Sequence, residues 1–231
     1  MRRCCGCGTR RWPRRGCAGA GEGEAAVTRV DAALVRRWLT ETEEALAREA
    51  GRLTELDSAI GDADHGSNMR RGFAAVRAAL EREEPASPGR ALVLAGRTLV
   101  GTVGGASGPL FGTLLRRAGK VLGEAEQVSA EEFAAALREG VSAVARLGGA
   151  AAGDKTMVDA LEPAAAALPD FAAAQRAAEE GAAATVPLRA RKGRASYLGE
   201  RSAGHEDPGA ASAALLVAAL ARAAEQEASR G

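Results

Sequence analysis

Residues 129–144, SAEEFAAALREGVSAV, carry the pattern on which the fold class of this chain depends. Ser129 followed by Glu132 is a capping box, in which each side chain satisfies a free backbone donor of the other residue where a helix begins. The apolar side chains behind the box recur every three or four residues, the period of one helix face. They are Phe133, Leu137, Val141 and Val144. The stretch therefore predicts a helix with one buried face.

Helical spacing extends over most of the chain on either side. Apolar stripes of the same period run through residues 30–39, 69–80 and 110–122. Alanine-rich segments studded with leucine follow at 156–168, 170–184 and 209–228. Alanine at this density favours closely packed helices, and no stretch alternates apolar and polar residues as a half-buried strand would. The sequence predicts an all-α fold of seven or eight antiparallel helices joined by short loops.

Bulk composition limits the function classes. The 231 residues, 46% of them hydrophobic, are enough for one buried core and hence for one domain. A net charge of +1 gives no electrostatic footprint for nucleic acid or for an anionic membrane. No apolar run approaches the roughly 20 residues that span a bilayer. We expect a cytoplasmic protein with no nucleic-acid partner and no membrane partner.

Residues 1–26 differ in kind from the rest. They are rich in arginine and glycine, show no helical or strand period, and contain all four cysteines of the chain. The absence of cysteine from the rest of the chain fits a protein of a reducing compartment. The cysteines lack the two C-x-x-C units of a typical zinc site, since only Cys4 and Cys7 have that spacing. We expect a disordered extension, or a start codon placed too early, ahead of a helical domain at 27–231.

Glycine and polar residues gather in four connections between the predicted helices. These connections are residues 56–69, 101–108, 148–156 and 191–209. An up-and-down bundle returns alternate loops to the same end, so residues far apart in sequence meet there. The sequence therefore predicts that the polar chemistry lies at one end of the bundle.

The first connection, LDSAIGDADHGSNM at residues 56–69, holds three aspartates close together. Asp57, Asp62 and Asp64 repel one another unless a cation lies between them. Hard oxygen ligands without cysteine suit Mg²⁺ or Ca²⁺. An EF-hand is rejected, because the twelfth position counted from Asp62 is Phe73 and not a bidentate glutamate. We predict a metal site formed by all three, against the alternative that each aspartate caps a helix or bends a turn.

The second and third connections bear on phosphate binding. In GGASGPL, Ser107 precedes a helix expected to begin near Pro109, and a helix N-terminus binds anions, although an ordinary helix cap has the same pattern. GGAAAGDKT at residues 148–156 nearly matches a P-loop. Asp154 is inserted before the lysine, however, and a helix stripe precedes the glycines where a P-loop needs a strand. A P-loop is therefore rejected, and Thr156 and Met157 are kept as candidate nucleotide neighbours.

Four motifs in order carry a resemblance to a known family. LDSAIGDADHGSNMRRGF, VGGASGPLFGTLL, GDKTMVDAL and ARKGRASYLGERSAGHEDPGA resemble the signatures of the L subunit of dihydroxyacetone kinase, its nucleotide-binding part. The match runs from about Val30 to the C-terminus. It implies an antiparallel eight-helix, barrel-like bundle whose loops at one end hold ADP or ATP through two Mg²⁺ ions.

The resemblance also implies roles for individual residues. Asp57, Asp62 and Asp64 match the metal ligands. Residues around the phosphates are His65, Gly66, Ser67, Asn68, Ala106 and Ser107. The rest of the nucleotide pocket is Gly148, Met157, Arg194, Asp207, Pro208 and Gly209. The three aspartates and Arg194 are the expected catalytic groups, because phosphoryl transfer depends on positioning and charge neutralisation.

The two histidines have separate expectations. His65 beside the phosphates is expected to act as a neutral hydrogen-bonding group, with a phosphorylated intermediate as the alternative. His205 is expected to shape the pocket loop. The connection before Gly153 is more alanine-rich than in the family, a departure that affects the adenine-side contacts, including that of Gly148.

The partners follow from the resemblance as well. In this family the ketose is held on a separate K subunit, through a histidine, and nothing here resembles that α/β module. We expect a K-type partner and an M-type phosphoprotein of the phosphotransferase system that recharges bound ADP. Alternatives are an ATP-exchanging kinase subunit and a regulator that binds a transcription factor. A fatty-acid kinase domain is disfavoured, because its D-G-D-T-G-T-N pattern differs from Asp62-Ala63-Asp64-His65-Gly66.

Overall fold

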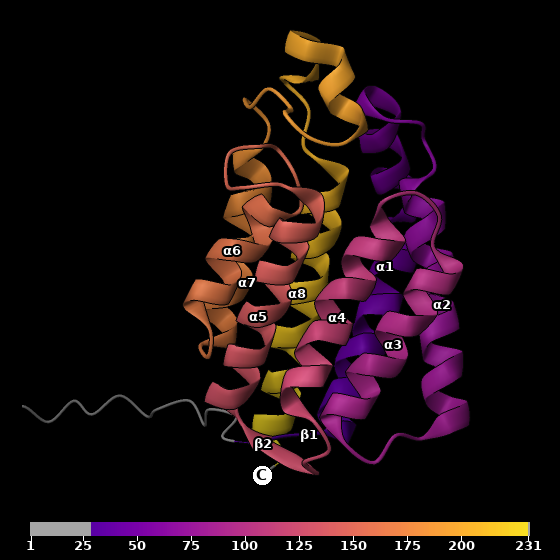
Figure 1. The fold of residues 1–231 in the computed structure, drawn as a ribbon, viewed down its shortest axis with the longest axis vertical. Helices are drawn as coiled ribbons and strands as arrows, with labels where there is room; N and C mark the ends of the chain where they lie inside the picture. Colours follow the sequence, from indigo (N-terminus) through magenta and orange to yellow (C-terminus); the bar gives the residue numbers. More distant parts are fainter. Residues whose placement is uncertain (1–28, 231) are drawn as a thin grey trace, which may run out of the picture.

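The computed structural model describes residues 29–230, and these form an elongated helical bundle (Figure 1). The predicted mostly helical fold is confirmed. The α-helices are α1 (Ala32–Ile60), α2 (His65–Glu83), α3 (Pro88–Thr102), α4 (Ser107–Leu122), α5 (Ala130–Gly148), α6 (Val158–Ala167), α7 (Phe171–Ala184) and α8 (Pro208–Ala228). The expected N-terminal extension and its cysteines lie outside the described residues. None of the described helices combines the length and the apolar content needed to cross a membrane.

Each helix packs against the next one along the chain, and α8 packs against α1. The chain therefore runs up and down the long axis of the molecule (Figure 1). The connections α1–α2, α3–α4 and α5–α6 lie at the same end as the segment between α7 and α8. A 3-10 helix, η1 (Arg194–Ser202), forms within that segment, which the sequence pattern had presented only as a loop. This arrangement brings the four polar connections to one end.

Two short strands at the opposite end correct the expectation that the chain has none. β1 (Arg29–Asp31) and β2 (Gln127–Ser129) pair antiparallel, with Val30 opposite Val128. Each strand has three residues, too few for an alternating pattern to stand out in the sequence. The last residue of each strand is the N-cap of the helix that follows, so the pairing ties the beginnings of α1 and α5 together.

The core is built from a few large side chains and many alanines. Trp38 packs edge-to-face on Phe133, with ring centroids 5.9 Å apart, and donates a hydrogen bond of 2.8 Å to the carbonyl of Leu216. Helix α8 contacts α1, α6 and α7 and buries most of its residues. Alanine fits there because its small side chain lets a helix approach neighbours on several sides. The alanine-rich composition is thus a consequence of packing.

Helices α3 and α4 approach so closely that glycine is required between them. A Cβ added at Gly112 would lie 2.7 Å from the carbonyl oxygen of Gly96, and one at Gly96 would lie 2.6 Å from that of Gly112. Two helical turns away, Gly89 of α3 and Gly119 of α4 face each other in the same way. This contact holds α4 close against α3, and the beginning of α4 lines the site described next.

Candidate nucleotide and metal site

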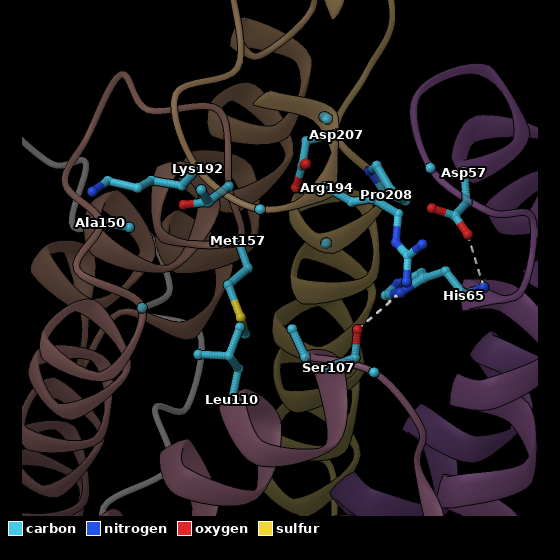
Figure 2. Close-up of a pocket in the computed structure, with 18 of the residues that line it drawn as sticks. Asp57, His65, Ser107, Leu110, Ala150, Met157, Lys192, Arg194, Asp207 and Pro208 are labelled. Atoms are coloured by element: carbon cyan, nitrogen blue, oxygen red, sulfur yellow. Dashed lines mark hydrogen bonds between the residues drawn. The ribbon is translucent and has the colours of Figure 1, made fainter. Parts of the chain in front are cut away.

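A cleft of about 490 Å³ opens at the end where the four polar connections meet (Figure 2). All four predicted connections contribute to its wall. The lining includes Asp57, Asp62, Asp64 and His65 from the first, Gly104 to Ser107 from the second, Gly148 and Thr156 from the third with Met157 directly after it, and Arg194, Asp207, Pro208 and Gly209 from the last. Most of the site residues expected from the sequence therefore share one cavity.

The three aspartates form one cluster on the α1–α2 side of the cleft. One carboxylate oxygen from each of Asp57, Asp62 and Asp64 lies within 4.8 Å of the others. Asp57, buried in the last turn of α1, accepts hydrogen bonds from the backbone N–H groups of Asp64 (2.9 Å) and His65 (3.1 Å). These bonds fold the loop back over the helix end. The donor set, all carboxylate oxygen, fits a hard cation such as Mg²⁺.

Arg194 reaches this cluster from across the cleft. Its guanidinium forms an ion pair with Asp62, with Nη2 and Oδ2 3.1 Å apart. Both side chains are exposed, so the pair alone contributes little stability. Its significance is positional, because it places a permanently charged planar donor at the edge of the carboxylate cluster.

His65 is held on both sides by hydroxyl groups. Its Nδ1 lies 3.1 Å from Ser107 Oγ (Figure 2), and its Nε2 lies 2.9 Å from Ser212 Oγ on α8. Burial lowers the pKa of the imidazole below its ordinary value, although Asp57, Asp64 and the Pro208 carbonyl act in the opposite direction. Burial thus favours the neutral form of the ring.

Ser212 is a residue that the sequence analysis missed. It is buried in α8, and its hydroxyl also lies 3.0 Å from the carbonyl oxygen of Gly209. One signal was available, because Ser212 is the only polar side chain between residues 209 and 221. A lone hydroxyl in such an apolar helix points to a specific buried partner.

Three expected phosphate neighbours do not line the cleft. Gly66 packs α2 onto α1, since a Cβ there would lie 2.1 Å from the carbonyl oxygen of Ala50. The Ser67 hydroxyl donates back to the carbonyl of Asp64 at 2.9 Å, and buried Asn68 accepts a hydrogen bond of 2.7 Å from Arg71. The structure places all three in the first turn of α2, behind the aspartate loop.

The opposite side of the cleft is lined mainly by apolar groups, with the Lys192 side chain beside them (Figure 2). Leu110, Met157 and Ala150 lie on this side (Figure 2). Gly148 completes this wall, and a Cβ added there would be only in ordinary contact, 3.8 Å from Leu110 Cδ2 and from Ala150 Cβ. The cleft therefore has an end with three carboxylates and an end with a mainly apolar lining.

Asp207 is the N-cap of α8, and its side chain accepts a hydrogen bond of 2.8 Å from the N–H of Ala210. Burial raises the pKa of its carboxyl from 3.8 to about 7, despite the opposing effects of that hydrogen bond and of Lys155. Lys155 and Lys192 also line the cleft, and the sequence pattern had singled out neither of them as a site residue. The His205 side chain does not line it.

A family model described as the DAK2 domain matches residues 59–222, more than half of the chain. The chain belongs to the DAK2-domain family. The match includes Asp62 and Asp64, the glycine-rich connections and the beginning of α8.

Relatives of this DAK2-domain chain have known names. It is 42% identical over 200 residues to the "PEP-dependent dihydroxyacetone kinase, ADP-binding subunit DhaL" of Escherichia coli (strain K12), covering 82% of this chain and 95% of that protein. It is 42% identical over 184 residues to the DhaL subunit of dihydroxyacetone kinase 1 of Listeria innocua, covering 80% and 92%. The resemblance to the L subunit of dihydroxyacetone kinase is confirmed, and these homologues are subunits of a kinase that acts on an alcohol group.

A solved structure is also similar to this DAK2-domain chain. The dihydroxyacetone kinase from C. freundii in complex with AMP-PNP and Mg²⁺ superposes with a TM-score of 0.65 at 27% identity. The alignment covers 93% of this chain and 38% of that one. The chain thus spans a little over a third of that kinase.

Proposed function

We propose that this chain is the ADP/ATP-binding L subunit of a dihydroxyacetone kinase. It would transfer a phosphoryl group from Mg-bound nucleotide to dihydroxyacetone held on a separate K-type subunit. The observation that carries the proposal is the cleft, in which three clustered carboxylates and the first turn of α4 face the same space. The identity to DhaL subunits along nearly their whole length supports it. Residues 27–231 are the proposed nucleotide-binding domain, with its site in the loops at one end of a barrel-like bundle.

Asp57, Asp62 and Asp64 are the proposed metal ligands, and the resemblance implies two Mg²⁺ ions. Bound Mg²⁺ neutralises charge on the phosphate oxygens of the nucleotide. The two backbone N–H groups that hold Asp57 fix its carboxylate in place before any ligand arrives. Such preorganisation lowers the free-energy cost of binding.

The chain provides further groups for phosphate. Helix α4 begins at Ala106 and Ser107 with no side-chain cap, so its first N–H groups are free to donate to an anion. Arg194 supplies a guanidinium that can move from Asp62 to a phosphate oxygen. His65, neutral and held by two serines, orients Ser107 beside them. Gly66, Ser67 and Asn68 are proposed to act through the first turn of α2.

The apolar end is the proposed site of the adenine. Leu110, Met157 and Gly148 offer apolar surface at the far end of the cleft from the aspartates. Asp207, Pro208 and Gly209 close the side between the two ends. A nucleotide would thus lie with its phosphates at the aspartates and its base on this wall.

The last part of the proposal concerns the donor that converts bound ADP back to ATP. The PEP-dependent kinases to which the DhaL relatives belong favour a system in which ADP stays bound and is recharged by an M-type phosphoprotein. In the alternative, the subunit exchanges ADP for ATP from solution.

A single-turnover experiment tests the proposed kinase activity and distinguishes retained ADP from exchanged ATP. The protein is loaded with ATP and Mg²⁺, freed of unbound nucleotide, and mixed with a K-type subunit and dihydroxyacetone. We expect one product per chain, with no further turnover on excess ATP until an M-type phosphoprotein is added. Continuous turnover on ATP alone would establish the exchanging kinase. No product with a competent K-type subunit would contradict the enzymatic proposal and favour the regulator.

A further inference from the structure

Lys155 is a buried cation for which the proposed chemistry has no use. Its side chain is 1% exposed, and burial lowers the pKa of its ammonium, although Asp207 and Asp159 act in the opposite direction. A buried charge is costly unless its hydrogen-bonding groups are satisfied. The contacts of Lys155 therefore call for an explanation.

The ammonium donates to three backbone carbonyls. Its Nζ lies 2.7 Å from the carbonyl oxygen of Thr185 and 3.4 Å from that of Val186, and it also donates to the carbonyl of His205. An ammonium has three N–H donors, so every donor has an acceptor. The three carbonyls come from two segments, one directly after α7 and one shortly before α8, separated by residues 187–204.

These two segments flank the loop of residues 187–204, which we call the 187–204 excursion. The N–H of Gly204 donates to the carbonyl of Val186 at 2.8 Å, which closes the excursion at its base. Just outside it, the N–H of Asp207 donates to Thr185 Oγ1 at 2.9 Å. The excursion carries Arg194, whose guanidinium reaches Asp62 across the cleft.

We propose that Lys155 is a positioning residue that clamps the base of the 187–204 excursion and thereby holds Arg194 over the aspartate cluster. Lys155 lies in the same connection as Thr156 and Met157, so the clamp also ties the apolar wall to the excursion. The aspartate cluster is held separately, by the bonds to Asp57, and does not depend on the clamp.

Hydrogen exchange of the nucleotide-free protein tests the clamp directly. Lys155→Met keeps the length of the side chain and removes all three donors. We expect exchange in peptides covering 187–204 to become about tenfold faster, with peptides of α3 and α4 unchanged. Unchanged exchange in 187–204, or equal acceleration throughout the protein, would overturn the proposal.

Arg138→Met is the matched control. Arg138 also donates to two backbone carbonyls, those of Ala165 (3.3 Å) and Leu168 (3.1 Å), where α6 ends. We expect this variant to leave exchange in 187–204 as in the wild type. Acceleration there as large as with Lys155→Met would overturn the assignment to Lys155.

A second variant decides the question if Lys155→Met does not fold. Lys155→Gln replaces the ammonium with a shorter amide that has two N–H donors for the three carbonyls. We expect faster exchange confined to 187–207, smaller than for the loss of all three donors. No change in that segment would overturn the clamp.

A double-mutant cycle on ADP affinity tests whether Lys155 acts through Arg194, and this step rests on the proposed function. We expect Lys155→Met to weaken Mg-dependent ADP binding about tenfold in the wild type and hardly at all in an Arg194→Met background. Equal losses in both backgrounds would overturn positioning through Arg194. Absence of ADP binding in the wild type would contradict the proposed function instead, and the exchange experiment would still decide the clamp.

Discussion

At the scale of single residues, Asp207 links the site to stability. Its buried carboxyl has a pKa of about 7 against an ordinary 3.8, so between these values the folded protein holds a proton that the unfolded chain releases. Stability therefore falls as pH rises through this range and levels off above pH 7. We expect Asp207 to contribute a decrease of about 2 kcal/mol in the free energy of unfolding between pH 5 and pH 8.

Urea unfolding of the nucleotide-free protein at several pH values measures this decrease. Asp207→Asn is the comparison, because asparagine keeps the N-cap and does not titrate. The variant should lack that part of the pH dependence and should be more stable than the wild type at pH 8. Parallel pH profiles for the two proteins would contradict the assignment to Asp207.

Gly148 allows the adenine wall to be tested without disturbing the fold. The structure has room for a Cβ at this position, which lies in α5. We expect Gly148→Ala to keep or raise stability, by up to about 1 kcal/mol. ADP affinity should nevertheless fall by roughly tenfold, because the added methyl group would occupy space proposed for the base. Calorimetric titration and thermal unfolding measure the two effects.

Gly51→Ala is the control for that prediction. Gly51 lies in α1, with no atom within 4 Å of an added Cβ, and it does not line the cleft. It should gain similar stability with unchanged ADP affinity. If Gly148→Ala bound ADP as well as Gly51→Ala, the adenine would not lie against Gly148.

At the scale of helices, the contact between α3 and α4 depends on glycine. A Cβ at Gly112 would lie 2.7 Å from the Gly96 carbonyl oxygen and 2.5 Å from Val100 Cγ2, so the helices must move apart. We expect Gly112→Ala to lower the free energy of unfolding by about 1 to 3 kcal/mol, measured with urea. Gly101→Ala in α3, where nothing lies within 4 Å, should not destabilise the protein. Equal stability of the two variants would contradict the close approach.

Secondary structure was predictable where its signal is local. The capping box of Ser129 and Glu132 is present, with both reciprocal hydrogen bonds. The pairing of β1 with β2 was not predictable, because it depends on two three-residue segments that meet only after the bundle has formed. Helix η1 was missed for a related reason, since its polar sequence has no apolar stripe and its position depends on contacts at the base of the excursion.

At the scale of the whole molecule, the up-and-down course of the chain explains why the site was largely predictable. Four connections rich in glycine and polar residues had to meet at one end, and the cleft contains residues from all four. Two groups that support the site were not predictable from local pattern. Ser212 lies within an apolar helix, and Lys155 acts through carbonyls of residues distant in sequence. Their partners are defined only by the folded structure.

The central claim is that the aspartate loop holds the nucleotide through Mg²⁺, and ADP binding with and without Mg²⁺ tests it most directly. Asp62→Asn with Asp64→Asn is the variant. The control is Asp31→Asn with Asp170→Asn, an equal change of charge at two N-caps that asparagine preserves. We predict that removing Mg²⁺ weakens ADP binding at least about tenfold in the wild type and control. The variant should bind weakly with or without Mg²⁺. Retention of Mg²⁺-dependent ADP binding by the variant would contradict the account.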